Sequence, residues 1–183
     1  MKKIFAMILT LALLLCGFAM AEGKTVKPMV TEIDLAAPAD GIYAAYFAPA
    51  DLGDGQLKFT IYTEDCYDIV DIDTLAVGDT IIAGGIDEGG FNLRPYDEDN
   101  CWKMALEDDY ATWSEYGETT LPLADDVTFT DGWNIEKNPE TTTGAEAVAG
   151  AITGTDMDYF SPLNTTVRVE GGKIVEIVRA YMP

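Results

Sequence analysis

The end of the chain carries the pattern that most constrains the fold. Residues 166–170 alternate apolar and polar side chains, and residues 173–182 are rich in apolar side chains, on either side of the pair Gly171-Gly172. A period of two is typical of a half-buried strand, and two glycines suit a two-residue hairpin turn. The chain is therefore predicted to end in a β-hairpin. The hairpin carries branched apolar side chains that must be buried in a core, among them Val167, Val169, Ile174 and Ile177.

Strand and turn patterns recur along the rest of the chain. Residues 42–47 and the alternating run Leu57, Phe59 and Ile61 predict another hairpin around a turn at residues 51–55. Residues 143–152 are the best helix candidate, and residues 108–116 are expected to make one helical turn. Further strands are predicted at 80–83, 91–94, 101–106, 119–123 and 127–129. The expected fold is mostly β, a small barrel or sandwich of short antiparallel strands with one short helix.

The first residues predict a secretory signal. Two lysines precede an uncharged apolar run at residues 4–18, shorter than the roughly 20 residues that span a bilayer. The triplet at 19–21, Ala-Met-Ala, is typical of a cleavage site. We expect cleavage after Ala21 and a secreted or extracytoplasmic product, with a lipoprotein anchored at Cys16 as the alternative. Residues 22–40 are expected to be a tether, and residues 41–183 a single acidic β domain.

The absence of histidine excludes much enzyme chemistry. Histidine is the commonest general base and metal ligand near neutral pH. Ser-His-Asp and Cys-His catalysis are excluded in their usual forms, as are zinc sites that contain histidine. Neither Ser114 nor Ser161 lies in a G-x-S-x-G motif. We therefore expect no enzyme and no cofactor. The alternative is a glycan hydrolase that uses carboxylates alone.

The charge is strongly acidic, with 32 Asp and Glu against 11 Lys and Arg. The predicted signal holds two of the basic residues and none of the acidic ones, so the cleaved chain has a net charge of −23. Such a surface repels nucleic acid and anionic membranes. It suits solubility outside the cell or a cationic partner. We expect no nucleic-acid partner and, after cleavage, no membrane span.

Cys66 and Cys101 are the cysteines that remain after the predicted cleavage. An even number of cysteines in an exported chain favours a disulfide. Two buried free thiols are the alternative.

Aromatic and acidic residues form the candidate sites. Carboxylates beside aromatic rings are a common way to bind sugars, because a ring covers the apolar C–H face and a carboxylate accepts hydroxyl hydrogen bonds. The same rings also fit a role in packing. The five candidates are Trp102, Tyr110, Trp113, Tyr116 and Trp133. No metal site is expected, because no segment has EF-hand spacing. If calcium binds, the first ligands are Asp65, Asp68, Asp71 and Asp73.

Three motifs carry a resemblance: residues 75–81 (LAVGDTI), the glycine pairs at 84–85 and 89–90, and the hairpin at 167–175. Together they resemble uncharacterised exported acidic β-rich proteins of anaerobic Gram-positive bacteria, over residues 41–183. The stretch between Ile82 and Gly84 is shorter here than in that group. The resemblance implies location and fold type, with no activity.

The expected product is a secreted or cell-surface binding module. Its ligand would be a glycan or another exterior protein. A structural domain without a discrete ligand is a further alternative.

Overall fold

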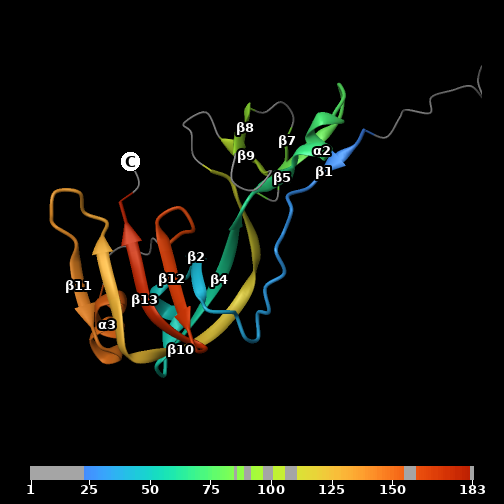
Figure 1. Cartoon of the computed structure of the whole chain (residues 1–183). Helices are drawn as coiled ribbons and strands as arrows, with labels where there is room; N and C mark the ends of the chain where they lie inside the picture. Colours follow the sequence, from blue (N-terminus) through green and yellow to red (C-terminus); the bar gives the residue numbers. More distant parts are fainter. Residues whose placement is uncertain are drawn as a thin grey trace, which may run out of the picture.

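The computed structural model describes residues 23–84, 86–88, 92–96, 101–105, 111–154 and 160–181. Within these residues the protein is mostly β and has two lobes (Figure 1). The main lobe is a seven-stranded sheet with one packed helix, and the small lobe carries two three-stranded sheets. This sandwich-like or barrel-like arrangement confirms the predicted fold class.

The main lobe is built from two stretches of chain around the small lobe. Its elements are β2 (Gly41–Tyr46), η1 (Pro49–Asp51), β3 (Leu52–Gly53), β4 (Gln56–Glu64), β10 (Trp113–Gly132), β11 (Glu140–Thr143), α3 (Ala145–Thr153), β12 (Thr165–Glu170) and β13 (Lys173–Ala180). The strand order is β11-β10-β13-β12-β2-β4-β3, with a further pairing of β10 to β4. That pairing makes the sheet close on itself.

Strand β10 produces the closure because its two halves pair with different partners. Trp113 to Pro122 pair antiparallel with β4. Leu123 and residues 128–132 pair parallel with β13, with a register shift between Leu123 and Thr128. Figure 1 shows β10 descending from the small lobe, turning beneath the main sheet and rising again beside β13. The two ends of this strand therefore lie on different parts of the molecule.

The core of the main lobe lies inside the closed sheet. Val148 and Ile152, one turn apart on α3, pack into it, and Phe47 stacks on Phe160 with 4.3 Å between ring centroids. The largest fully buried side chains of this core are Phe47, Leu57, Phe59, Ile61, Val127, Val148, Ile152, Phe160, Ile174 and Ile177. The buried face of α3 is therefore formed by apolar side chains one helical turn apart.

The predicted terminal hairpin is confirmed. Strands β12 and β13 pair antiparallel around Gly171 and Gly172, whose φ angles are 57° and 73°. L-residues rarely adopt such angles, and glycine adopts them without steric cost. The four branched side chains predicted to need a core, Val167, Val169, Ile174 and Ile177, are fully buried.

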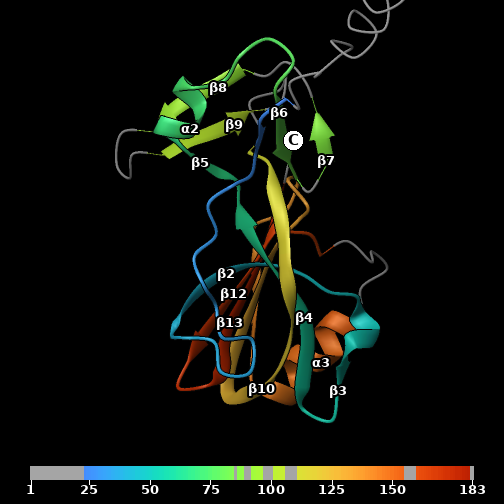
Figure 2. The same ribbon diagram turned by 90° about the vertical axis from the view of Figure 1, so that its right-hand side faces the viewer.

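Apart from β1, which precedes the main lobe, the small lobe is inserted between β4 and β10. Its elements are β1 (Thr25–Val26), β5 (Cys66–Asp68), α2 (Ile69–Asp73), β6 (Thr80–Ala83), β7 (Ile86–Glu88), β8 (Asn92–Tyr96) and β9 (Cys101–Ala105). They form the sheets β1-β6-β7 and β5-β9-β8 (Figure 2). A second, smaller core contains Val26, Tyr67, Ile81 and Ala83.

The predicted disulfide is present in the small lobe. Cys66 on β5 is bonded to Cys101 on β9, with their Cα atoms 5.4 Å apart. This separation is typical of disulfides.

Residues 23–40, for which the sequence indicated a tether, lie along both lobes. β1 pairs with β6, and Met29 bridges to Cys66. The Tyr116 hydroxyl accepts a hydrogen bond from the Ile33 N–H at 2.7 Å. These contacts are made largely by backbone groups, so no side-chain pattern predicts them.

Two local predictions need correction. Of the helical turn predicted at 108–116, residues 113–116 belong instead to β10, where 113–115 pair with β4, and residues 108–110 lie outside the described residues. The runs 119–123 and 127–129 are parts of this same strand.

In the described part of the chain, no helix is long and apolar enough to cross a membrane.

Candidate functional site

An ion pair fixes one end of the main lobe. Asp131 near the end of β10 lies opposite Arg179 of β13 in the parallel register. The guanidinium donates from Nε to Asp131 Oδ1 at 3.0 Å and from Nη2 to Oδ2 at 2.5 Å. The Arg179 side chain is only 2% exposed, and its guanidinium carbon lies 4.7 Å from the ring centroid of Phe160. Two-point contact with a carboxylate is the strong form of such a pair.

The ion pair also sets the charge state of Asp131. Partial burial alone would raise the pKa of its carboxyl. The hydrogen bond from Arg179, a second one from the Trp133 N–H and the Arg179 charge outweigh burial and hold the pKa below its ordinary value. Asp131 is therefore an ionised, oriented acceptor at neutral pH.

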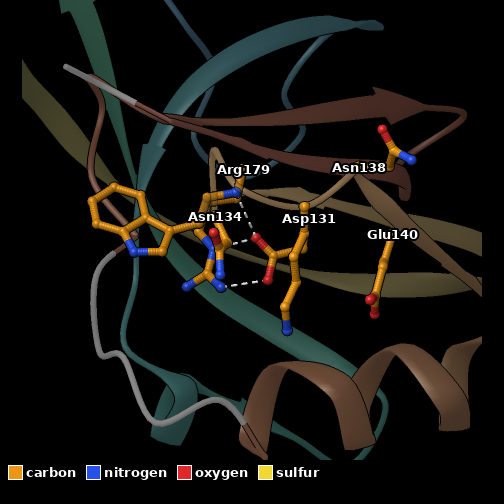
Figure 3. A pocket seen from close by; sticks show the side chains of 7 residues that line it. Asp131, Asn134, Asn138, Glu140 and Arg179 are labelled. Carbon is orange, nitrogen blue, oxygen red and sulfur yellow. Dashed lines mark hydrogen bonds and ion pairs between the residues drawn. The ribbon is translucent and has the colours of Figure 1, made fainter.

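A pocket of about 190 Å³ lies beside this ion pair (Figure 3). In the figure the Asp131 carboxylate points toward Arg179, and Asn138 and Glu140 lie on its other side. The lining residues are Asp131, Trp133, Asn134, Lys137, Asn138, Glu140 and Arg179. They come from the ends of β10 and β13, the start of β11 and the loop between β10 and β11.

One aromatic side chain, Trp133, lines the pocket, and its ring contacts Tyr181. Trp133 is partly buried, and its ring centroid lies 6.2 Å from that of Tyr181, with an angle of 55° between the planes. Tyr181 is 41% exposed. The two rings are tilted and not coplanar, so they form a corner instead of one flat surface. The pocket thus combines an apolar edge with amide and carboxylate groups.

The loop that carries the pocket amides is held by its own hydrogen bonds. The Asn134 side-chain oxygen accepts from the Glu136 N–H at 2.9 Å, and the Lys137 N–H donates to the Asn134 carbonyl at 3.0 Å. The first bond uses the side-chain carbonyl oxygen of Asn134, and the second uses its main-chain carbonyl. The Asn134 NH₂ group and the exposed Asn138 amide can meet a ligand.

The five aromatic candidates are not gathered at one place. Trp133 lines the pocket, whereas Trp113 lies at the opposite end of β10, paired with Glu64. The Tyr116 hydroxyl bonds the backbone of Ile33. Trp102 is on β9 with its side chain outside the description, and Tyr110 lies outside the described residues.

Sequence reasoning missed most of the pocket. The lining residues that it did not name are Asn134, Lys137, Asn138, Glu140 and Arg179, whereas Asp131 was one of the carboxylates beside the aromatic candidates. Arg179 could have been noticed in the sequence. It lies two residues after the apolar Ile177 on a predicted strand, so the two side chains share a face, and basic residues are rare in this chain. No local pattern marked the others.

The four acids named for calcium have separate roles. Asp65 is buried and accepts from the Gly84 N–H at 2.6 Å. Asp68 caps α2 by accepting from the Val70 N–H, and Asp71 pairs with Lys24 at 2.8 Å. Asp73 ends α2. Within the described residues, no three or more Asp, Glu or Cys side chains are close enough together to hold a metal ion.

A second pocket, of about 400 Å³, lies beside the disulfide. It is lined by Met29, Thr31, Thr63, Glu64, Cys66, Cys101 and Lys103. Its two charged groups form an ion pair, Lys103 to Glu64 at 2.5 Å. None of its lining residues is an aromatic ring, so we regard the pocket beside Asp131 as the stronger candidate for ligand binding.

Fold and site together define a two-lobed, mostly β protein with a polar pocket, lined by one aromatic ring, at one end of its main sheet. No protein-family model, curated protein or solved structure matches the chain. The function must therefore be argued from the residues of the chain itself.

Proposed function

We propose that this protein is an exported binding module and that its ligand is a glycan, held through one sugar ring in the pocket beside Asp131 and Trp133. The observation that carries the proposal is the lining of that pocket. An aromatic side chain, a fixed carboxylate and two amides surround one small space.

The chemistry of this lining suits a sugar. An aromatic ring covers the apolar C–H face of a pyranose, while amides and carboxylates bond its hydroxyls. The volume of about 190 Å³ is below the roughly 300–1,000 Å³ typical of sites for drug-sized ligands. One ring or the end of a glycan chain is therefore the unit that fits.

Export is supported by the predicted signal and by the bond between Cys66 and Cys101. Disulfides form and persist in oxidising surroundings outside the cytosol. The acidic composition agrees with a protein that stays soluble there.

The pocket favours binding over hydrolysis. Asp131 and Glu140 lie opposite each other in the register of β10 and β11, and both line the pocket. A glycosidase needs one carboxylic acid that keeps its proton to protonate the leaving group. The lowered pKa of Asp131 is unsuited to that role, and both of its oxygens already accept bonds from Arg179.

A glycan array with the chain from residue 22 onward tests the proposal. For each glycan that binds, we expect Trp133→Ala to weaken affinity about tenfold, the amount lost when a stacked ring is removed. Trp113→Ala is the matched control, because it removes the same side chain at the other end of β10. Its affinity should equal that of the unmodified protein.

Three outcomes would contradict the proposal. Binding to no glycan would favour a structural domain or a protein ligand. Loss of binding in Trp113→Ala alone would place the site elsewhere. Release of free sugar from a bound glycan would favour the hydrolase.

A further inference from the structure

The neck between the two lobes contains a second polar site, independent of the pocket beside Asp131. Strands β4 and β10 run side by side into the small lobe (Figure 2). Their pairing reaches Glu64 and Trp113, and the Asp65 N–H then donates to the Thr112 carbonyl at 2.9 Å. Asp65 and Thr112 are therefore opposite each other at the entrance to the small lobe.

Among the residues that the structure describes, three buried oxygens at this neck have no hydrogen-bond partner: Asp65 Oδ1, Thr112 Oγ1 and Ser114 Oγ. Asp65 is 1% exposed and Thr112 is 7% exposed. Side chains two residues apart on a strand share a face, and opposite residues on paired strands do too. Asp65 and Thr112 lie one pair beyond the last β4–β10 pair, and their hydrogen bond continues the ladder, so their side chains are placed on the face that Ser114 occupies.

The charge of Asp65 lacks a counter-ion. Its Oδ2 accepts from the Gly84 N–H, which satisfies one oxygen without neutralising the carboxylate. No ion pair in the described part of the chain involves Asp65, and the nearby lysines are engaged elsewhere, Lys103 with Glu64 and Lys24 with Asp71. Burying an unpaired charge is costly. A water molecule would satisfy hydrogen bonds here but would leave the charge in place.

We infer that these three oxygens bind a monovalent metal cation such as Na⁺, with Asp65 as the charged ligand. Hard cations bind carboxylate, hydroxyl and carbonyl oxygens. One carboxylate balances one positive charge, so a monovalent ion leaves the buried site neutral. This site differs from a cluster of acids, because it has one carboxylate and two hydroxyls.

The ion would fasten the small lobe to the main lobe. Thr112 and Ser114 belong to the strand that leads back into the main lobe, whereas Asp65 also holds the end of β6 through Gly84. A cation shared by these residues links β6 to the first residues of β10. The site is therefore expected to bind its ion only in the folded protein, and binding stabilises the fold.

Thermal melts in two chloride salts test this. Sodium chloride and tetramethylammonium chloride at equal ionic strength screen surface charge alike, but the organic cation cannot be coordinated by oxygens. We expect a saturable rise of several degrees in Tm in sodium relative to tetramethylammonium. Asp65→Asn should abolish the difference, and Thr112→Val should reduce it.

The matched control is Asp68→Asn, which removes one negative charge from a partly exposed neighbour. It should keep the full sodium effect. A sodium NMR linewidth that broadens with the unmodified protein, and less with Asp65→Asn, provides a readout apart from stability. If Asp65→Asn does not fold, the sodium effect on Tm is compared between Thr112→Val and the unmodified protein.

Equal Tm values in the two salts would overturn the inference, and so would a sodium effect that persists in Asp65→Asn and in Thr112→Val. A rise specific to calcium would overturn the assignment to a monovalent ion.

Discussion

Arg179 is a charged residue buried in the main lobe. The Arg179 side chain is 2% exposed, so its guanidinium loses nearly all its hydrating water. The ion pair with Asp131 and the contact with the face of Phe160 offset this loss. Arginine tolerates such a place because its planar fork makes two bonds to one carboxylate. The pair also joins β10 to β13 where their side chains border the pocket.

Removing the carboxylate should therefore be costly. We expect Asp131→Asn to lower the free energy of unfolding by about 3 kcal/mol, since the buried guanidinium then lacks its counter-charge. Urea denaturation measures this. The control is Glu140→Gln, because Glu140 lies opposite Asp131 and is exposed. Its stability should be close to that of the unmodified protein. Equal losses in both variants would show that the loss does not come from the buried ion pair.

The penalty in Asp131→Asn should depend on pH in a defined direction. The folded pKa of Asp131 lies below the ordinary value of 3.8. A carboxyl with a lowered pKa adds stability above its unfolded pKa, and this is lost as the pH falls through the folded pKa. The difference in stability between the two proteins should thus be constant near neutrality and shrink below about pH 4. A difference that grows in acid would contradict the ion pair.

At the level of elements, the terminal hairpin is the part on which the main sheet depends most. β12 and β13 lie in its middle, between β2 and β10. Four fully buried branched side chains contribute about 1.5–3 kcal/mol each, comparable with the 5–15 kcal/mol of net stability usual for a domain.

Deleting residues 166–183 should therefore abolish the cooperative thermal melt, as followed by circular dichroism. Point substitutions in the hairpin test the same expectation without shortening the chain. Ile177→Ala should cost about 2–5 kcal/mol, whereas Val178→Ala, at the next and partly exposed position, should cost less. A deletion variant that still melts cooperatively would mean that the hairpin is an appendage.

The hairpin was predictable because its signals are local, with branched apolar side chains on each side of a glycine pair. Strand β10 was not, because its course depends on β4 and β13, which are distant in sequence. Asp125 and Asp126 look like a turn between two short strands, yet the chain changes partner there and continues. The pocket was missed for the same reason. It forms where β10 and β13 end together, and neither strand alone marks that place.

The charge of the whole molecule gives one further expectation. Against a net charge of −21, the described ion pairs are few and mostly exposed. Like charges repel more in the compact state than in the expanded chain. Raising the salt should stabilise the fold, because the Debye length falls from about 30 Å at 0.01 M to about 8 Å at 0.15 M.

The salt for this measurement is tetramethylammonium chloride, which screens charge without entering an oxygen site. Tm should rise between the two concentrations and level off beyond them. A Tm that falls with added salt would show that attraction between charges outweighs repulsion in this fold.

The way the chain enters and leaves the small lobe has an evolutionary consequence. Asp65 and Thr112 are joined by a 2.9 Å hydrogen bond, so the intervening residues depart from and return to one point of the ladder. Segments attached through adjacent ends can be lengthened, shortened or exchanged with little disturbance to their host. The residues beyond this point are therefore free to diverge faster than the closed sheet. Among descendants of a common ancestor, we expect chains that share the pocket beside Asp131 and carry a different insert, or only a tight turn, in its place.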